Sequence, residues 1–282
     1  QSPVSTVIPD GDGKTPIADG GFADSAHYSF IALGAPAGVL PNVEVYRADG
    51  TPYATFRAYA ANFQGGVRVA LADLDGDTIP EVVTGAGSGG CPHVRVFKPY
   101  GAIVSEFFAY DKASNQGVNV AIGDVDADGW EDIVTAVGSG VSNDVIAWSQ
   151  SGIELSRFTV TGFVAGAPLS VAVADVDNDW DKEIVVFSET GESRVAIYNA
   201  DGSRVVDFIA FPGELNGVRV DVGDFDFDAR DEIVAVDGSD TLSGMTKVRI
   251  YNKIGALWGG FEMTRPPLAP PLQGGEVNVS VT

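Results

Sequence analysis

The sequence has few of the residues from which catalytic and redox sites are usually built. Its 282 residues include one cysteine, Cys91, and two histidines, His27 and His93. An internal disulfide is therefore impossible, and cysteine usage gives no indication of the redox compartment. Cys91 and His93 are close enough in sequence to suggest a nucleophile and a base. The matching places one repeat earlier hold Leu40 and Asn42, so we expect no catalytic pair and no enzyme.

Basic residues, long apolar runs and helical patterns are also scarce. The chain has 17 Lys and Arg against 39 Asp and Glu, which gives a formal net charge of −22. This charge argues against nucleic acid or anionic lipid as a partner. No apolar run is long enough to cross a membrane, so direct membrane insertion is not expected. Short alternating runs bounded by glycine replace the helical period, which predicts an all-β fold.

Acidic residues recur in four stretches with one spacing, which we call the first to fourth acidic loops (73–81, 124–132, 175–183 and 224–232). Carboxylates stand at positions one, three, five and nine: Asp73, Asp75, Asp77 and Glu81; Asp124, Asp126, Asp128 and Asp132; Asp175, Asp177, Asp179 and Glu183; Asp224, Asp226, Asp228 and Glu232. Alternate residues of a tight loop can point inward together, and Ca²⁺ takes about 6–8 oxygen ligands. A backbone carbonyl at position seven would nearly complete that shell, and this position holds Ile79, Trp130, Asp181 and Arg230.

A turn without a metal is the alternative interpretation, because Asp and Gly favour turns. Four copies in step favour the metal, since unpaired carboxylates packed so closely repel one another. We therefore predict about four Ca²⁺ per chain, which would change the net charge of −22 to −14. The stretch from Asp10 to Gly13 resembles a further loop, but Lys14 takes its fifth position, and we interpret it as a flexible turn.

The acidic loops are part of a repeat of about fifty residues. Their first aspartates are spaced by 51, 51 and 49 residues, and a turn glycine recurs at Gly50, Gly101, Gly152, Gly202 and Gly255. Each unit contains four expected strands. In the unit of the first acidic loop they are 67–72, 81–84, 93–97 and 103–110. Four-stranded units of this length predict the blades of a β-propeller.

The blade count depends on both ends of the chain. The segments 30–33, 42–46 and 53–59 match the second to fourth strands of a unit that lacks its first strand and its loop. The run 277–282 resembles 118–123 and would supply that first strand. We predict five blades closed by the C-terminal strand, with 1–21 as an extension and 22–282 as one domain. The expected blades are 28–64 plus 275–282, 65–115, 116–166, 167–215 and 216–274.

The pattern Asp-x-Asp-x-Asp-Gly-x-x-Asp between two strands, complete at 124–132 and accompanied by turns such as Gly85-Ala86-Gly87, resembles the FG-GAP/VCBS repeat family. Integrin α-subunits, bacterial surface proteins and some lectins carry such repeats. The resemblance implies Ca²⁺ bound by side chains at one, three, five and nine and by the carbonyl at seven. Glutamate at position nine in three loops departs from the pattern, and position six is glycine only in the second loop.

The leading functional hypothesis is a non-enzymatic, calcium-stabilised propeller for extracellular recognition or as a surface scaffold, secreted or at the cell surface. Gln1 as the first residue is consistent with a processed chain and equally with a trimmed one. Its partner would be a protein or glycan at the cell surface, and a homo-oligomer or surface assembly is compatible with this role. A lectin is the alternative. Trp130 and Trp180 lie in acidic loops, where an exposed indole could stack on a sugar, and packing against a neighbouring loop is an equal possibility. A polysaccharide-cleaving enzyme is less favoured, since most clustered acids are assigned to metal loops.

Overall fold

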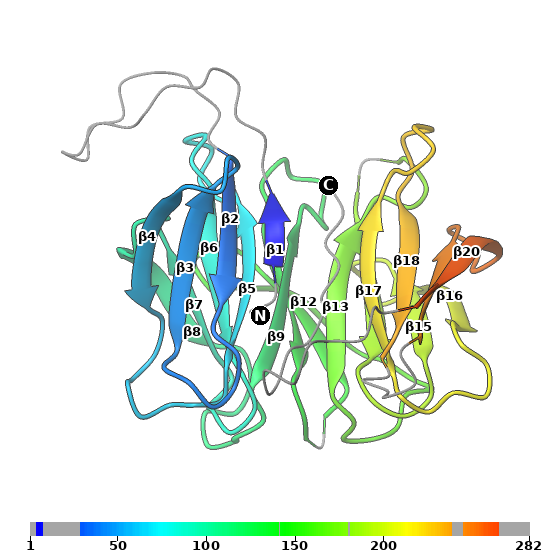
Figure 1. Ribbon diagram of the computed structural model, residues 1–282, viewed down its shortest axis with the longest axis horizontal. Helices are drawn as coiled ribbons and strands as arrows, with labels where there is room; N and C mark the ends of the chain where they lie inside the picture. Colours follow the sequence, from blue (N-terminus) through cyan, green and yellow to red (C-terminus); the bar gives the residue numbers. More distant parts are fainter. Residues whose placement is uncertain (1–3, 8–28, 141, 180, 239–244, 265–282) are drawn as a thin grey trace.

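The computed structural model describes residues 4–7, 29–140, 142–179, 181–238 and 245–264. These residues form five four-stranded antiparallel sheets arranged as successive blades (Figure 1). Each sheet is a meander in which strands adjacent in sequence are hydrogen-bonded. The all-β fold and the five blades predicted from the sequence are thus confirmed. In the described part of the chain, no helix has the length and apolar character that crossing a membrane requires.

Each blade is built from four strands that are consecutive in the sequence. Blade one contains β1 (Val4–Val7), β2 (Phe30–Gly34), β3 (Asn42–Arg47) and β4 (Pro52–Arg57). Blade two contains β5 (Val67–Ala72), β6 (Glu81–Ala86), β7 (His93–Phe97) and β8 (Ile103–Phe108). Blade three contains β9 (Val118–Gly123), β10 (Asp132–Val137), β11 (Asp144–Trp148) and β12 (Glu154–Thr159). Blade four contains β13 (Leu169–Ala174), β14 (Glu183–Ser188), β15 (Arg194–Tyr198) and β16 (Arg204–Ile209). Blade five contains β17 (Val218–Gly223), β18 (Glu232–Asp237), β19 (Met245–Tyr251) and β20 (Leu257–Thr264).

Blade one differs from the sequence-based prediction at its first strand. The strand beside β2 is β1, in which Val4 lies opposite Leu33 and Val7 opposite Ile31. Part of the expected extension 1–21 therefore belongs to a blade, in the place assigned to 277–282. Repeat similarity favoured the C-terminal run, whereas the short β-branched run Val4–Val7 matches a strand equally well by propensity. Residues 277–282 lie outside the described residues, and closure of the ring stays a prediction.

The hydrophobic core lies between blades rather than within them. One cluster joins blades one and two, and three further clusters join each later pair of neighbours. The second strand of blades two to five is buried at every position, because both faces of each sheet are covered there. The repeat therefore gains most of its apolar burial from stacking on the next repeat.

An aromatic pair and the turn glycine recur at four interfaces between blades. A phenylalanine of the fourth strand packs on the aromatic residue that ends the third strand of the next blade. The pairs are Phe56–Phe97, Phe107–Trp148, Phe158–Tyr198 and Phe208–Tyr251, with ring centroids 4.6–5.1 Å apart. A Cβ added at Gly101, Gly152, Gly202 or Gly255 would lie 2.5–2.7 Å from the same phenylalanine. The recurring glycine is thus required for close packing as well as for its left-handed turn.

Candidate metal centres

Each acidic loop connects the first strand of a blade to its second strand. The meander places all four connections on the same rim of the propeller, since each lies between equivalent strands. The backbone is left-handed at the fourth and sixth loop positions. The described residues with positive φ there are Gly76 and Thr78, Ala127 and Gly129, Asn178, and Phe227 and Ala229. This backbone conformation brings the side chains at positions one and three close to that at position nine.

The first aspartate of a loop holds the loop backbone. In the first loop, Asp73 Oδ1 accepts from Gly76 N at 2.8 Å and Oδ2 accepts from Thr78 N at 2.8 Å. In the second loop, Asp124 accepts from the amides of positions five and six, Asp128 and Gly129, at 3.1 and 2.9 Å. Because one charged carboxylate accepts two backbone amides, these hydrogen bonds hold the loop backbone without an ion.

The ninth residue is the buried anchor of each loop. One oxygen of Glu81, Asp132, Glu183 or Glu232 accepts the amide of the loop's second residue, at 2.9–3.2 Å. All four side chains belong to residues that are buried. The longer glutamate at three of these positions makes the same hydrogen bond as Asp132, so the departure from the expected pattern keeps this anchor in place.

The structure gathers carboxylate oxygens within 4.8 Å of one another in all four loops. Positions one, three and nine form one group in each: Asp73, Asp75 and Glu81; Asp124, Asp126 and Asp132; Asp175, Asp177 and Glu183; Asp224, Asp226 and Glu232. In the third loop Asp179 and Asp181 form a further group with Glu183. The side chain of Asp181 was missed by sequence reasoning, which assigned only its carbonyl. Its place among four other acids of the loop was the available signal.

Position five has a different contact in the other three loops. There Asp77, Asp128 and Asp228 each accept the amide of position seven, at 2.8–3.0 Å. The donors are Ile79, Trp130 and Arg230, whose carbonyls were predicted as ligands. The position-seven carbonyls as ligands stay a prediction.

The electrostatics of the loops favour a bound cation. Burial, followed by repulsion from the neighbouring aspartates, raises the pKa of Asp132 to about 7. The same two causes raise the pKa of Glu183 to about 7. Burial also raises the pKa of Glu232. Each of these groups is poorly compensated as a carboxylate, and a divalent ion would supply the missing opposite charge.

An unpaired oxygen supports the fit of Ca²⁺ to these residues. Among the described residues, Asp177 Oδ1 is buried and has no hydrogen-bond partner. It belongs to the third-loop group with Asp175 and Glu183. Hard carboxylate oxygens are the donor set that Ca²⁺ takes. The second, third and fourth loops could therefore hold Ca²⁺ with the residues predicted from the sequence.

The first loop is different because a lysine lies inside it. Lys98, which follows β7, places its Nζ 2.9 Å from Asp75 Oδ2, 2.7 Å from Asp77 Oδ2 and 2.6 Å from Glu81 Oε1. The Lys98 side chain is 19% exposed and that of Glu81 is 0% exposed. Sequence reasoning missed this lysine, since it is 17 to 23 residues from the carboxylates that it binds.

Neighbouring loops are also joined to one another by their backbones. The amide of Lys182, at position eight of the third loop, donates to the Asp124 carbonyl at 3.1 Å. The amide of Asp231, at position eight of the fourth loop, donates to the Asp175 carbonyl at 2.8 Å. In return, Asp175 N donates to Asp231 Oδ2 at 2.9 Å. The second and third loops, and the third and fourth loops, are therefore joined directly by hydrogen bonds.

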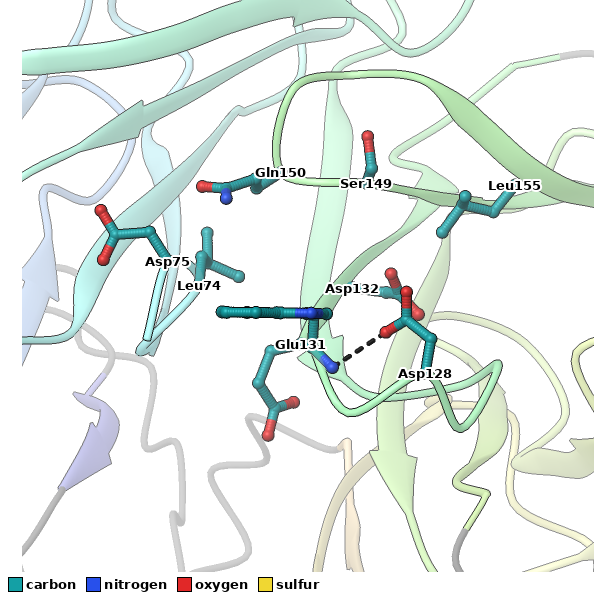
Figure 2. A pocket seen from close by; sticks show the side chains of 9 residues that line it. Leu74, Asp75, Asp128, Glu131, Asp132, Ser149, Gln150 and Leu155 are labelled. Carbon is teal, nitrogen blue, oxygen red and sulfur yellow. Dashed lines mark hydrogen bonds between the residues drawn. The ribbon is translucent and has the colours of Figure 1, made fainter. Parts of the chain in front are cut away.

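A hollow of about 310 Å³ lies between the first and second loops (Figure 2). Asp75 lies on one side of it, and Asp128 and Asp132 lie on the other (Figure 2). Trp130 also lines the hollow and is 52% exposed. Its ring atom Cζ3 would lie 2.8 Å from a Cβ added at Gly76, so the indole packs on the first loop. Packing on a neighbouring loop and an exposed face thus coexist at Trp130.

Five four-stranded blades, four of which have an acidic loop between their first and second strands, define a repeat β-propeller. A model of the FG-GAP-like repeat matches residues 124–186, which contain the second and third acidic loops. Residues 124–186 of this β-propeller thus match an FG-GAP-like repeat, as the resemblance to the family implied. No curated protein sequence matches the chain significantly.

Solved structures show the same fold at low sequence identity. The chain is 16% identical to the V. cholerae biofilm matrix protein Bap1, with a TM-score of 0.50, covering 94% of this chain and 40% of Bap1. It is 14% identical to the Dos1 propeller, with a TM-score of 0.52, covering 83% of this chain and 58% of that one. The rhamnogalacturonan lyase YesW, at 12% identity and a TM-score of 0.45, is too remote to support an argument; that match covers 93% of this chain and 65% of the lyase. This chain thus spans less than two thirds of each of these proteins.

Proposed function

We propose that the chain is a non-enzymatic, calcium-stabilised propeller that serves extracellular recognition or forms a surface scaffold. The convergence of buried and partly exposed carboxylates in the acidic loops carries this proposal. Each of those loops connects the first strand of a blade to its buried second strand, so an ion in a loop would stabilise the folded blade. Its fold is shared with a biofilm matrix protein, which is consistent with a secreted or cell-surface protein.

The partner in this proposal is a protein or a glycan at the cell surface, and self-assembly would suit a scaffold. A lectin is the second candidate, and the hollow beside the second loop favours it. Trp130 offers an exposed indole there, with Ser149 and Gln150 as neutral hydrogen-bonding groups. A sugar bound at this place would depend on the ion of the second loop, because Asp128 and Asp132 line the same hollow.

Calcium removal is the direct test of the proposal. An ion that binds only the folded form adds about 2.7 kcal/mol per site at one hundred times its dissociation constant. We expect chelation to lower the melting temperature clearly and calcium, but not magnesium at equal concentration, to restore it. The control is Asp126→Asn, which should remove one ion and reduce the calcium effect. An unchanged melt after metal analysis has verified removal would contradict a structural role.

The lectin alternative has a separate test. Binding to a glycan array should require calcium and should be lost in Trp130→Ala if the hollow is the site. A matched control is Trp258→Ala, which changes another indole that is 53% exposed, on β20 of blade five. Binding that survives Trp130→Ala, or that ignores calcium, would exclude this hollow as a lectin site.

A further inference from the structure

We propose that the first acidic loop is not a calcium site, because Lys98 supplies its cation from within the chain. The inference rests on the proposed function, in which the other acidic loops bind Ca²⁺. It predicts three ions per chain in place of the four that the carboxylate spacing indicates. The first loop then has a permanent cation that no chelator can remove.

The contacts of Lys98 fill the place that an ion would occupy. A lysine ammonium has three N–H donors. In this structure the three acceptors are Asp75, Asp77 and Glu81, all within 2.9 Å of Nζ. Two of these, Asp75 and Glu81, belong to the loop's converging carboxylate group. Ca²⁺ would need the same oxygens at about 2.3–2.6 Å, so the ammonium and the ion cannot share the centre.

Comparison of equivalent positions in blades two to five shows that only blade two has a lysine at this place. The turn after each third strand has a fixed hydrogen-bond pattern, in which its first residue donates to the carbonyl four residues later. The first residue is Lys98 in blade two, and Ser149, Asn199 and Asn252 occupy the same place in blades three to five. Serine and asparagine side chains are too short to enter the acidic loop as lysine does.

The short side chains at this place have another task. Ser149 Oγ accepts the amide of Ile153 at 3.2 Å, and Asn252 Oδ1 accepts the amides of Ile254 and Ala256 at 3.2 and 3.0 Å. Asn199 Nδ2 donates to Ser203 Oγ at 2.9 Å. These side chains stabilise their own turn and leave the carboxylates of the adjacent loop to an external cation.

Other cations near the loops do not take the place of an ion in this way. In the fourth loop Arg230 lies 3.4 Å from Asp228, both side chains are 45% exposed, and Asp228 is outside that loop's converging group. Lys182 lies 3.3 Å from Glu131, which is not one of the predicted ligands. Within the described residues, the three-carboxylate contact of Lys98 is therefore distinctive of the first loop.

The test counts and locates bound calcium in matched variants, with Ca²⁺ alone as the probe. Metal analysis after buffer exchange gives the count, and anomalous scattering from crystals grown with calcium gives the positions. We expect three ions in the original chain, in the second, third and fourth loops. Lys98→Ser introduces the residue of blade three and should raise the count to four, with the new ion in the first loop. Ser149→Lys, the reciprocal change, should lower the count to two by filling the second loop.

A second measurement keeps the test decisive if one variant folds poorly. Chelation should lower the melting temperature of Lys98→Ser more than that of the original chain, because its first loop then also depends on calcium. An ion in the first loop of the original chain would overturn the inference and leave the proposed function intact. A first loop that stays empty in Lys98→Ser would also overturn it. An absence of calcium from every loop in all variants would overturn both the inference about the first loop and the proposed calcium-stabilised function.

Discussion

At the scale of single residues, the acidic loops hold the backbone strain of the molecule. Within the described residues, five that are not glycine have positive φ, and all five lie in these loops. Thr78 is the most demanding of them, because a β-branched side chain is poorly tolerated at its φ of 69°. Such a residue costs about 1–3 kcal/mol, which the surrounding hydrogen bonds must offset. The concentration of strain in the loops is consistent with a binding role.

Replacement of Thr78 by glycine tests this strain. Gly129 holds the equivalent place in the second loop with a φ of 88°. We expect Thr78→Gly to raise the free energy of unfolding by on the order of 1 kcal/mol, because it relieves the left-handed strain. Chemical denaturation would measure the change. Thr78→Ala is the matched control, since it removes the hydroxyl and the methyl of the β-branch but keeps the Cβ, and it should give a smaller gain. Equal gains in both variants would show that the β-branch, and not the left-handed backbone, was responsible.

At the scale of elements, tyrosine hydroxyls link neighbouring blades. The hydroxyl of Tyr110, after β8 of blade two, lies 3.0 Å from the carbonyl oxygen of Thr135 and 2.9 Å from that of Asp144, both acceptors in blade three for its one hydrogen. Tyr59 of blade one similarly contacts the His93 carbonyl of blade two at 2.9 Å. Each hydroxyl therefore provides a hydrogen-bond donor to carbonyls at the interface between two blades, where water access is limited.

Tyr110→Phe should therefore weaken the seam between blades two and three. Leaving buried carbonyls without their donor costs about 1–3 kcal/mol. We expect a corresponding loss in the free energy of unfolding, measured by denaturant titration, with calcium binding unchanged. Tyr100→Phe is the control, because Tyr100 is 53% exposed and should tolerate loss of its hydroxyl. A loss of equal size in both variants would argue against an interblade role of Tyr110.

The first strand of blade one leads to another prediction at this scale. β1 pairs with β2, and its removal would leave the edge of β2 unpaired. Exposed strand edges promote association between chains. We expect deletion of residues 1–7 to lower the melting temperature and solubility, and deletion of 277–282 to have a smaller effect. The opposite order would restore the C-terminal run as the first strand of this blade.

Most of the strands and loops could be predicted from the sequence because both are local patterns. Alternating apolar residues and turn glycines mark the strands, and the Asp spacing marks the loops. What could not be predicted depends on contacts between distant segments. Lys98 enters the first loop from the end of β7, and this contact shows in the sequence only when the repeats are compared position by position. The first strand of blade one was predicted wrongly because two short runs, 4–7 and 277–282, have a similar strand propensity and either could pair with β2.

At the scale of the whole molecule, blade five exposes a surface whose equivalent in blades three and four is covered by the next blade. Phe261 on β20 pairs in register with Val248, as Phe158 pairs with Val145 and Phe208 with Val195. Phe158 and Phe208 each pack on the next blade, whereas Phe261 is 53% exposed.

The complementary surface lies on blade one, and the two together predict closure. Tyr46 holds the place that Tyr198 and Tyr251 hold in their blades, and a Cβ added at its turn glycine, Gly50, would meet nothing within 4 Å. In the corresponding turns of the other blades, the glycine is pressed against a phenylalanine of the preceding blade. A closed ring of five blades would therefore bring Phe261 onto Tyr46 and Gly50.

The matched variants Phe261→Ala and Phe158→Ala separate a closed ring from an open array. Replacing a fully buried phenylalanine by alanine costs about 3–5 kcal/mol, and a partly buried one costs less. In a closed ring Phe261 is an interblade residue like Phe158, so both variants should lose similar free energy of unfolding in denaturant titrations. In an open array Phe261→Ala should be nearly neutral and Phe158→Ala should still be costly. A neutral Phe261→Ala would therefore contradict the closed ring, since only closure gives this side chain a partner blade.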